Sequence, residues 1–134
     1  MKREQIQTEV DAAYLYSVLA EAEKDEAIAT IFREMSEIEK SHALAFLQKS
    51  GQQLPMPAPS MRAKILKNIG KVFGNDYILG VLMDTEKRIA GSIINHKKSM
   101  GESPTMTDTA HVSILQNILD GSATTPGSTV ARFE

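Results

Sequence analysis

The sequence predicts an all-α protein with the topology of a ferritin-like four-helix bundle. Three observations lead to this prediction: helix-favouring residues dominate, apolar residues recur at spacings of three and four, and a proline-rich crossover separates two helical hairpins. The chain has 134 residues, which is typical of one domain, and hydrophobic residues make up 42% of it. We assign residues 1–120 to this domain and residues 121–134, which begin with a run of Gly, Ser, Ala, Thr and Pro, to a linker.

The first predicted hairpin consists of helices over residues 4–24 and 26–49. Each helix carries one stripe that combines apolar and a few polar side chains, at Ile6, Glu9, Ala13, Tyr16, Ala20 and Glu23 in the first and at Ile28, Phe32, Met35, Glu39, His42 and Phe46 in the second. Lys24-Asp25 is the expected hinge, and Gly51 is the expected end of the second helix. We expect the two stripes to face each other in an antiparallel pair.

The crossover and the second hairpin follow. Residues 51–60 hold three of the five prolines and predict an extended loop. Residues 61–73 predict a short extra helix that is basic on one side, most simply a solvated face, with a membrane or partner contact as the less favoured interpretation. Helices are then expected over residues 76–100 and 107–120. A crossover as long as residues 51–73 lets the helices on either side of it run parallel, as in ferritin-like bundles.

Composition excludes several classes of function. The absence of cysteine excludes a disulfide framework, a zinc ribbon and thiolate redox chemistry. A net charge of −2 argues against nucleic acid as a partner. The polar N-terminus is not a signal peptide, and no stretch reaches the roughly 18 uninterrupted apolar residues that a membrane span needs. We expect the chain as given to be soluble and cytosolic.

Glu39 and His42 form the main candidate for chemistry. The i, i+3 spacing places both on one helical face, which the stripe predicts to be the inward one. Glu9 lies about 15 residues before the hinge and Glu39 about 15 after it, so a rise of about 1.5 Å per residue brings them to nearly the same height. Buried carboxylates and imidazole are costly unless something neutralises them, and a divalent metal does so.

These residues leave two interpretations open. A Glu-x-x-His sequence is short and common by chance, and a histidine on an apolar stripe is often a core residue with its hydrogen bonds satisfied. The registered Glu9 favours a metal site, in which oxygen and imidazole ligands suit iron or manganese better than copper. We expect a di-iron centre, with manganese or zinc as alternatives. Tyr16 could hydrogen-bond a ligating carboxylate or simply fill the core.

The second hairpin offers further ligand candidates in Glu86, Asp108 and His111. With a turn near residue 102, Glu86 lies about 16 residues before the turn, and Asp108 and His111 about 6 and 9 after it. The expected offset from Glu86 is about 10–15 Å. His96 lies nearer the height of Asp108. The second half could therefore bind metal differently, use His96, complete its site across a dimer, or be degenerate.

Two segments resemble the first half of the rubrerythrin family: residues 9–16 (Glu-Val-Asp-Ala-Ala-Tyr-Leu-Tyr) and residues 31–43 (Ile-Phe-Arg-Glu-Met-Ser-Glu-Ile-Glu-Lys-Ser-His-Ala). The resemblance implies that Glu9, Glu39 and His42 are ligands of a di-iron site. Rubrerythrins proper also carry a cysteine-rich rubredoxin module, which this chain does not have. A complete rubrerythrin-type peroxidase would therefore need an external electron donor.

Other segments resemble the erythrin domain that is fused to vacuolar-iron-transporter-like membrane proteins. Residues 55–66 and Phe73-Gly74 resemble that domain, and residues 128–134 resemble the stretch just before its membrane part. The resemblance implies the cytosolic N-terminal domain of a membrane iron or manganese transporter, tethered at the cytoplasmic face. The chain departs from the family in the second hairpin, where the family has a full Glu-x-x-His.

Two functions compete at this stage. The first is a metal-handling domain that binds Fe(II), senses it or passes it to a transporter, and acts as a ferroxidase with oxygen or peroxide. The second is a non-enzymatic helical module that forms a homodimer and uses its stripes for packing only. The number of metal ions bound per chain distinguishes them, because a packing module should bind none with useful affinity.

Overall fold

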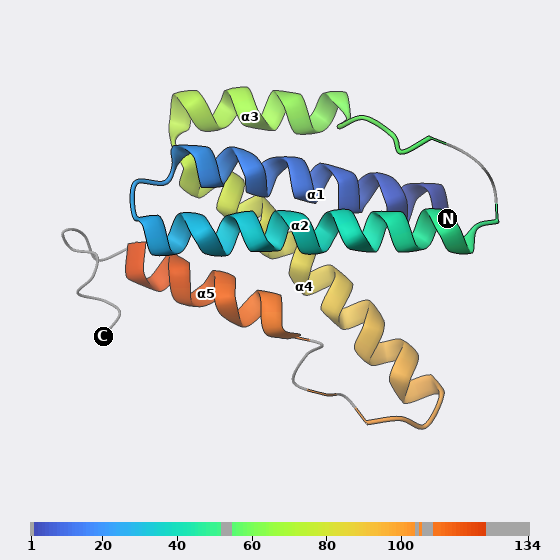
Figure 1. Cartoon of the computed structure of the whole chain (residues 1–134). Coiled ribbons are helices and arrows are strands. Elements are labelled where there is room, and N and C mark those ends of the chain that lie inside the picture. The colour runs from blue at the N-terminus through green and yellow to red at the C-terminus, as the bar shows by residue number, and fades with distance from the viewer. Residues whose placement is uncertain (1, 52–54, 104, 106–108, 123–134) are drawn as a thin grey trace. The chain divides into compact units, whose positions relative to one another are not determined.

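The computed structural model of the protein describes residues 2–51, 55–103, 105 and 109–122. The helices of this part of the chain are, in order, α1 (Lys2–Ala22), α2 (Glu26–Lys49), α3 (Met61–Phe73), α4 (Asn75–Ser99) and α5 (Ala110–Ser122), as Figure 1 shows. No strand occurs in the described ranges, so the predicted all-α class is confirmed. Among the same residues, none of the helices combines the length and the apolar character that a membrane span needs.

The chain divides into two compact units, residues 1–78 and 79–134, and the boundary lies inside α4. The first unit contains α1, α2, α3 and the first turn of α4. The second contains the remainder of α4 and α5. Each unit is described by itself.

Helices α1 and α2 form an antiparallel hairpin with a connection of three residues. Asp25 begins α2: its carboxylate accepts hydrogen bonds from the backbone N–H groups of Ala27 and Ile28, at 2.9 and 3.2 Å. These N–H groups have no partner inside the helix, so the cap stabilises its first turn. The predicted hinge at Lys24-Asp25 is thereby confirmed.

Two contacts hold the hairpin in register. The hydroxyl of Ser36 donates to the carbonyl oxygen of Ala13 across the interface at 2.8 Å, and this serine is buried. About one turn further along α1, the fully buried ring of Tyr16 stacks on Phe32 with centroids 6.4 Å apart. A hydrogen bond without access to water and an aromatic pair both depend on axial position, so together they define the register.

The start of α3 is fastened to α1. The carboxylate of Asp11 accepts from the backbone N–H of Ser60 at 2.9 Å and from its hydroxyl at 2.6 Å. The same hydroxyl oxygen accepts from the N–H of Ala63 and so caps α3. Gln7 donates to both Asp11 and the carbonyl of Ala58. The proline-containing segment before α3 is therefore held along α1 by side-chain hydrogen bonds, and α3 packs on α1 (Figure 1).

A glycine corner joins α3 to α4. Gly74 has a φ of 104°, which residues with a side chain rarely adopt, and its N–H caps α3 by donating to the carbonyl of Gly70. The corner brings the fully buried Ile78 against Gly70 so closely that a Cβ at position 70 would overlap the Ile78 side chain. The break predicted after residue 73 is confirmed.

The second unit buries apolar residues from both of its helices, namely Leu79, Leu82, Met83 and Ala90 of α4 and Leu115 and Ile118 of α5. The helix predicted over residues 107–120 is shifted. It begins at Ala110 and continues to Ser122, two residues into the predicted linker. Residues 107 and 108, and residues 123–134 of the linker, lie outside the described part of the chain.

Replacing Gly70 should test the tight corner. We expect Gly70→Ala to lower the free energy of unfolding by about 1–3 kcal/mol, because the new methyl group overlaps the fully buried side chain of Ile78, which must shift within the core. Gly91→Ala in α4 is the matched control, since a Cβ there meets nothing within 4 Å. It should raise stability by up to about 1 kcal/mol through helix propensity. Urea unfolding followed by circular dichroism measures both, and equal effects would contradict the corner contact.

Candidate metal centre

Glu9 of α1 and the pair Glu39 and His42 of α2 converge in the hairpin. One ligand atom from each lies within 4.8 Å of the other two. The Nδ1 atom of His42 is 3.1 Å from Oε1 of Glu39 and 3.6 Å from Oε1 of Glu9. The predicted proximity of these three residues is confirmed.

Both carboxylates are buried, with 7% of Glu9 and 2% of Glu39 exposed. Oε1 of Glu9 has no hydrogen-bond partner within the described part of the chain, since His42 is slightly too distant. Burial, helped by the nearby Glu39 carboxylate, raises the pKa of Glu9 from 4.5 to about 7, although His42 acts in the opposite direction. Burial costs the carboxylate more than the 3.6 Å contact with His42 returns, so Glu9 is largely protonated below neutral pH.

His42 occupies the boundary between core and solvent. Its side chain is 51% exposed, which differs from the prediction that it faces inward. At about 100° per residue, His42 lies about 60° around the helix from Glu39, while Ala43 lies only about 40° away on the other side. Ala43 is fully buried and continues the inward stripe. His42 therefore keeps one side towards water and directs Nδ1 at the carboxylates.

The carboxylates determine the charge of the imidazole. Hydrogen bonding to Glu39, together with the attraction of Glu9, raises the pKa of His42 from 6.5 to about 10. Because the ring is half exposed, water screens part of this attraction, and the associated stabilisation is small. At neutral pH His42 is an imidazolium beside Glu39, and Glu9 is partly protonated. These are the protons that a bound cation would displace.

The donor set fits a divalent metal ion. Two carboxylates and a neutral imidazole nitrogen are ligands that iron and manganese accept, and a cation would give the unpartnered Oε1 of Glu9 a partner. It would also remove the repulsion between two adjacent carboxylates in a poorly hydrated place. The exposed side of His42 leaves solvent access to the group.

A second carboxylate–imidazole pair lies in the second unit. Nδ1 of His111, near the start of α5, is 3.3 Å from Oε2 of the buried Glu86 on α4. The predicted offset of about 10–15 Å between these residues is therefore wrong. The prediction assumed a tight turn near residue 102, and the contact between Glu86 and His111 excludes the helix register that such a turn would impose.

The remaining candidates have different outcomes. Asp108 lies outside the described residues. His96 is exposed near the end of α4 and belongs to no acid–histidine group among the residues described. Tyr16 is fully buried against Phe32, as a core residue would be, and its hydrogen bond to a ligating carboxylate stays a prediction.

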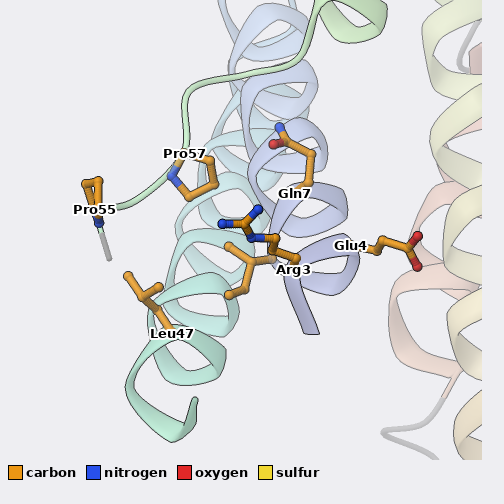
Figure 2. A pocket seen from close by; sticks show the side chains of 7 residues that line it. Arg3, Glu4, Gln7, Leu47, Pro55 and Pro57 are labelled. Atoms are coloured by element: carbon orange, nitrogen blue, oxygen red, sulfur yellow. The ribbon is translucent and has the colours of Figure 1, made fainter. Parts of the chain in front are cut away.

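A hollow of about 510 Å³ lies elsewhere in the first unit, at the start of α1 and the end of α2. Its lining combines the apolar residues Ile6, Leu47, Pro55 and Pro57 with the polar residues Arg3, Glu4 and Gln7. Figure 2 shows the Glu4 side chain pointing away from the two prolines. No residue of the acid–histidine group lines this hollow, so the chemical groups and the hollow are separate features.

Sequence reasoning did not identify the Asp11–Ser60 connection. Asp11 is two residues from Glu9, and it holds the start of α3 on the helix that carries the first ligand. Ser60 before an apolar helix does signal an N-cap. Nothing in the sequence, however, pairs its hydroxyl with a carboxylate 49 residues away.

Comparison with known proteins yields no relative. The chain matches no family model, no curated protein and no solved structure. The candidate ligands therefore rest on the geometry of their own side chains.

The raised pKa of Glu9 predicts how the stability of the metal-free protein depends on pH. Below pH 4.5 the carboxyl group is protonated in both states. Between pH 4.5 and about 7 the unfolded chain loses the proton while the folded chain keeps it, so rising pH favours unfolding. We expect this group to remove about 1–3 kcal/mol of stability over that range.

Glu9→Gln should abolish that part of the pH dependence, because the amide does not titrate. Glu4→Gln, at an exposed position of the same helix, is the control and should leave the profile unchanged. Urea unfolding at intervals from pH 4.5 to 8, with a chelator present, measures the profiles. Identical profiles for Glu9→Gln and the wild type would contradict the raised pKa.

Proposed function

We propose that this chain is a metal-binding helical protein that holds a divalent iron ion between α1 and α2 through Glu9, Glu39 and His42. The observation that carries the proposal is the buried Oε1 of Glu9, which lacks a hydrogen-bond partner and lies within 4.8 Å of a second carboxylate and an imidazole nitrogen. A buried acceptor in such a group costs free energy unless a cation or a proton occupies it. Iron or manganese is the cation that this mixture of ligands favours.

The chain's own residues determine how such an ion is held. Glu39 and His42 lie one turn apart on α2 and offer a carboxylate oxygen and Nδ1 on the same side. Glu9 approaches from α1, so the ion would join the two helices. When bound, iron supplies Lewis-acid and one-electron redox chemistry. Before binding, Glu9 and His42 hold protons that the ion must displace, so affinity should increase with pH.

Further parts of the proposal rest on the sequence. The residue pattern predicts a ferritin-like arrangement of α1, α2, α4 and α5, a second set of ligands in Glu86, Asp108 and His111, and a homodimer. The resemblance implies a di-iron centre and attachment to a membrane iron or manganese transporter, and oxidation of Fe(II) by oxygen or peroxide would follow from such a centre. The short contact between Glu86 and His111 supports a metal-ligating role for that pair, because it brings a buried carboxylate to an imidazole.

Anaerobic titration with Fe(II) tests the first group of ligands. We expect the wild type to bind iron and Glu39→Gln to bind it at least about tenfold more weakly, because an amide oxygen carries no charge to offset the cation. Glu37→Gln is the matched control on the exposed side of α2 and should bind like the wild type. Calorimetry in buffers of different ionisation enthalpy should also detect about one to two protons released per ion at pH 7.

The outcomes of this titration separate the two functions. Equal affinity in the wild type and Glu39→Gln would contradict the assignment of the site. No binding by the wild type would contradict the metal-binding function altogether and favour the helical packing module. Circular dichroism of each variant shows whether it is folded, and Mn(II) and Zn(II) titrations under the same conditions establish metal preference.

The number of ions bound tests the pair in the second unit. We expect two ions per wild-type chain and fewer in His111→Ala, because this substitution removes the imidazole beside Glu86. Loss of both ions would support the di-iron centre predicted from the sequence, whereas loss of one would indicate separately bound ions. His96→Ala, at an exposed histidine of the same unit, is the control. Unchanged stoichiometry in His111→Ala would remove Glu86 and His111 from the proposal.

A further inference from the structure

Positive charge is concentrated in the middle of the chain. No Asp or Glu occurs between Glu39 and Asp76, whereas six of the chain's 15 basic residues lie there. Four of the six are in α3, at Arg62, Lys64, Lys67 and Lys71. Among the described residues, none of these four pairs with a carboxylate. The helix therefore presents its charge to the surroundings although the protein as a whole carries a net charge of −2.

The same helix also exposes apolar side chains. Met61 is 72% exposed, Ile65 51% and Val72 75%, and Phe73 at the end of α3 is 76% exposed. At about 100° per residue, positions 61, 65 and 72 fall within about 40° of one another around the axis. They share one stripe on the outer face of α3, which the exposed Asn68 interrupts between Ile65 and Val72. Large apolar side chains gathered in one place indicate an interaction surface, whereas scattered ones need no explanation.

The basic residues border this stripe on both sides. By the same rotation, Lys64, Lys67 and Lys71 lie about 60–120° to one side of Met61, and Arg62 lies about 100° to the other. Long basic side chains next to apolar ones can bend towards anionic groups while their methylene stems cover apolar surface. An apolar stripe flanked by cations is the pattern of helices that lie in a membrane–water interface.

The rest of the first unit presents α3 in a fixed orientation. Its opposite face is formed by Ala63, Leu66 and Gly70, which are buried. Ser60 at its start is hydrogen-bonded to Asp11 of α1. The helix is thus already formed, and its apolar stripe is already turned outward. Binding through this face requires no folding step, which would otherwise oppose association.

We propose that the outer face of α3 docks on an anionic lipid bilayer, with Met61, Ile65 and Val72 entering the interface and the four basic residues contacting lipid phosphates. A single helix presents a convex surface, to which a deformable bilayer adapts without a preformed groove. The helix α3 itself carries no Asp or Glu, so none of its own side chains repels anionic headgroups.

Vesicle co-sedimentation of the 134-residue chain tests the proposal. Vesicles of phosphatidylcholine alone are compared with vesicles of phosphatidylcholine and phosphatidylglycerol in equal parts, at low and at physiological salt. We expect binding to the anionic vesicles only, and weaker binding as salt increases, because screening reduces the attraction of lysines to the surface.

Two sets of variants identify the face. Lys64→Glu/Lys67→Glu/Lys71→Glu should weaken binding to anionic vesicles at least roughly tenfold, since each basic residue near such a surface contributes about fivefold. Lys24→Glu/Lys87→Glu/Lys98→Glu has the same net charge but alters exposed lysines elsewhere, and it should retain more of the binding. Met61→Ser/Ile65→Ser/Val72→Ser should also weaken binding while preserving its dependence on salt. Circular dichroism establishes that each variant is folded.

Several results would overturn the proposal. These are equal binding to neutral and anionic vesicles, no binding at low salt, or equal losses in the two lysine variants. A different result would identify the face as a contact between two copies of the chain. In that case the wild type would not bind vesicles but would self-associate, and the α3 variants would abolish the self-association. None of these readouts involves metal, so failure here leaves the iron site untouched.

Discussion

The arrangement of the first unit depends on the burial of two carboxylates, Glu9 and Glu39, in the interface between α1 and α2. Two negative charges this close, with little water around them, repel unless a proton or a cation intervenes. Without metal, the proton on Glu9 and the imidazolium of His42 serve that purpose. The hydrogen bond from Ser36 and the stacking of Tyr16 maintain the helix register that keeps the carboxylates together.

Much of the helical layout could be predicted, because it follows from local sequence. The periodic stripes run along the helices they indicate. Asp25 lies directly before the start of α2, and Gly74 lies directly after the end of α3. Counting residues from the hinge also predicted the meeting of Glu9 with Glu39, since the connection between α1 and α2 has only three residues. A short connection leaves little freedom in register, so the rise per residue fixes which side chains lie at the same height.

Counting residues from the turn gave the wrong heights for Glu86 and His111, because the connection between α4 and α5 is long. Ten residues separate α4 from α5, so a residue count does not determine the register of these helices, and Glu86 meets His111 although a tight turn would separate them. The hydrogen bond between Asp11 and Ser60 could not be predicted from the sequence either, because it depends on how α3 packs on α1. His42 lies about 60° around the helix axis from Glu39, and this angle leaves it half exposed. The periodic pattern in the sequence assigns both residues to the same face and does not distinguish positions that differ by this angle.

The half-exposed imidazole of His42 has a kinetic consequence. Two of the three donors in the group are sealed in the helix interface, but the third can swing into water without disturbing the packing of Ala43 beside it. An ion held there could shed one ligand at a time and exchange with solution while the hairpin stays folded. Rotation of His42 would thus open the site to water, and the two buried carboxylates would keep their positions between the helices.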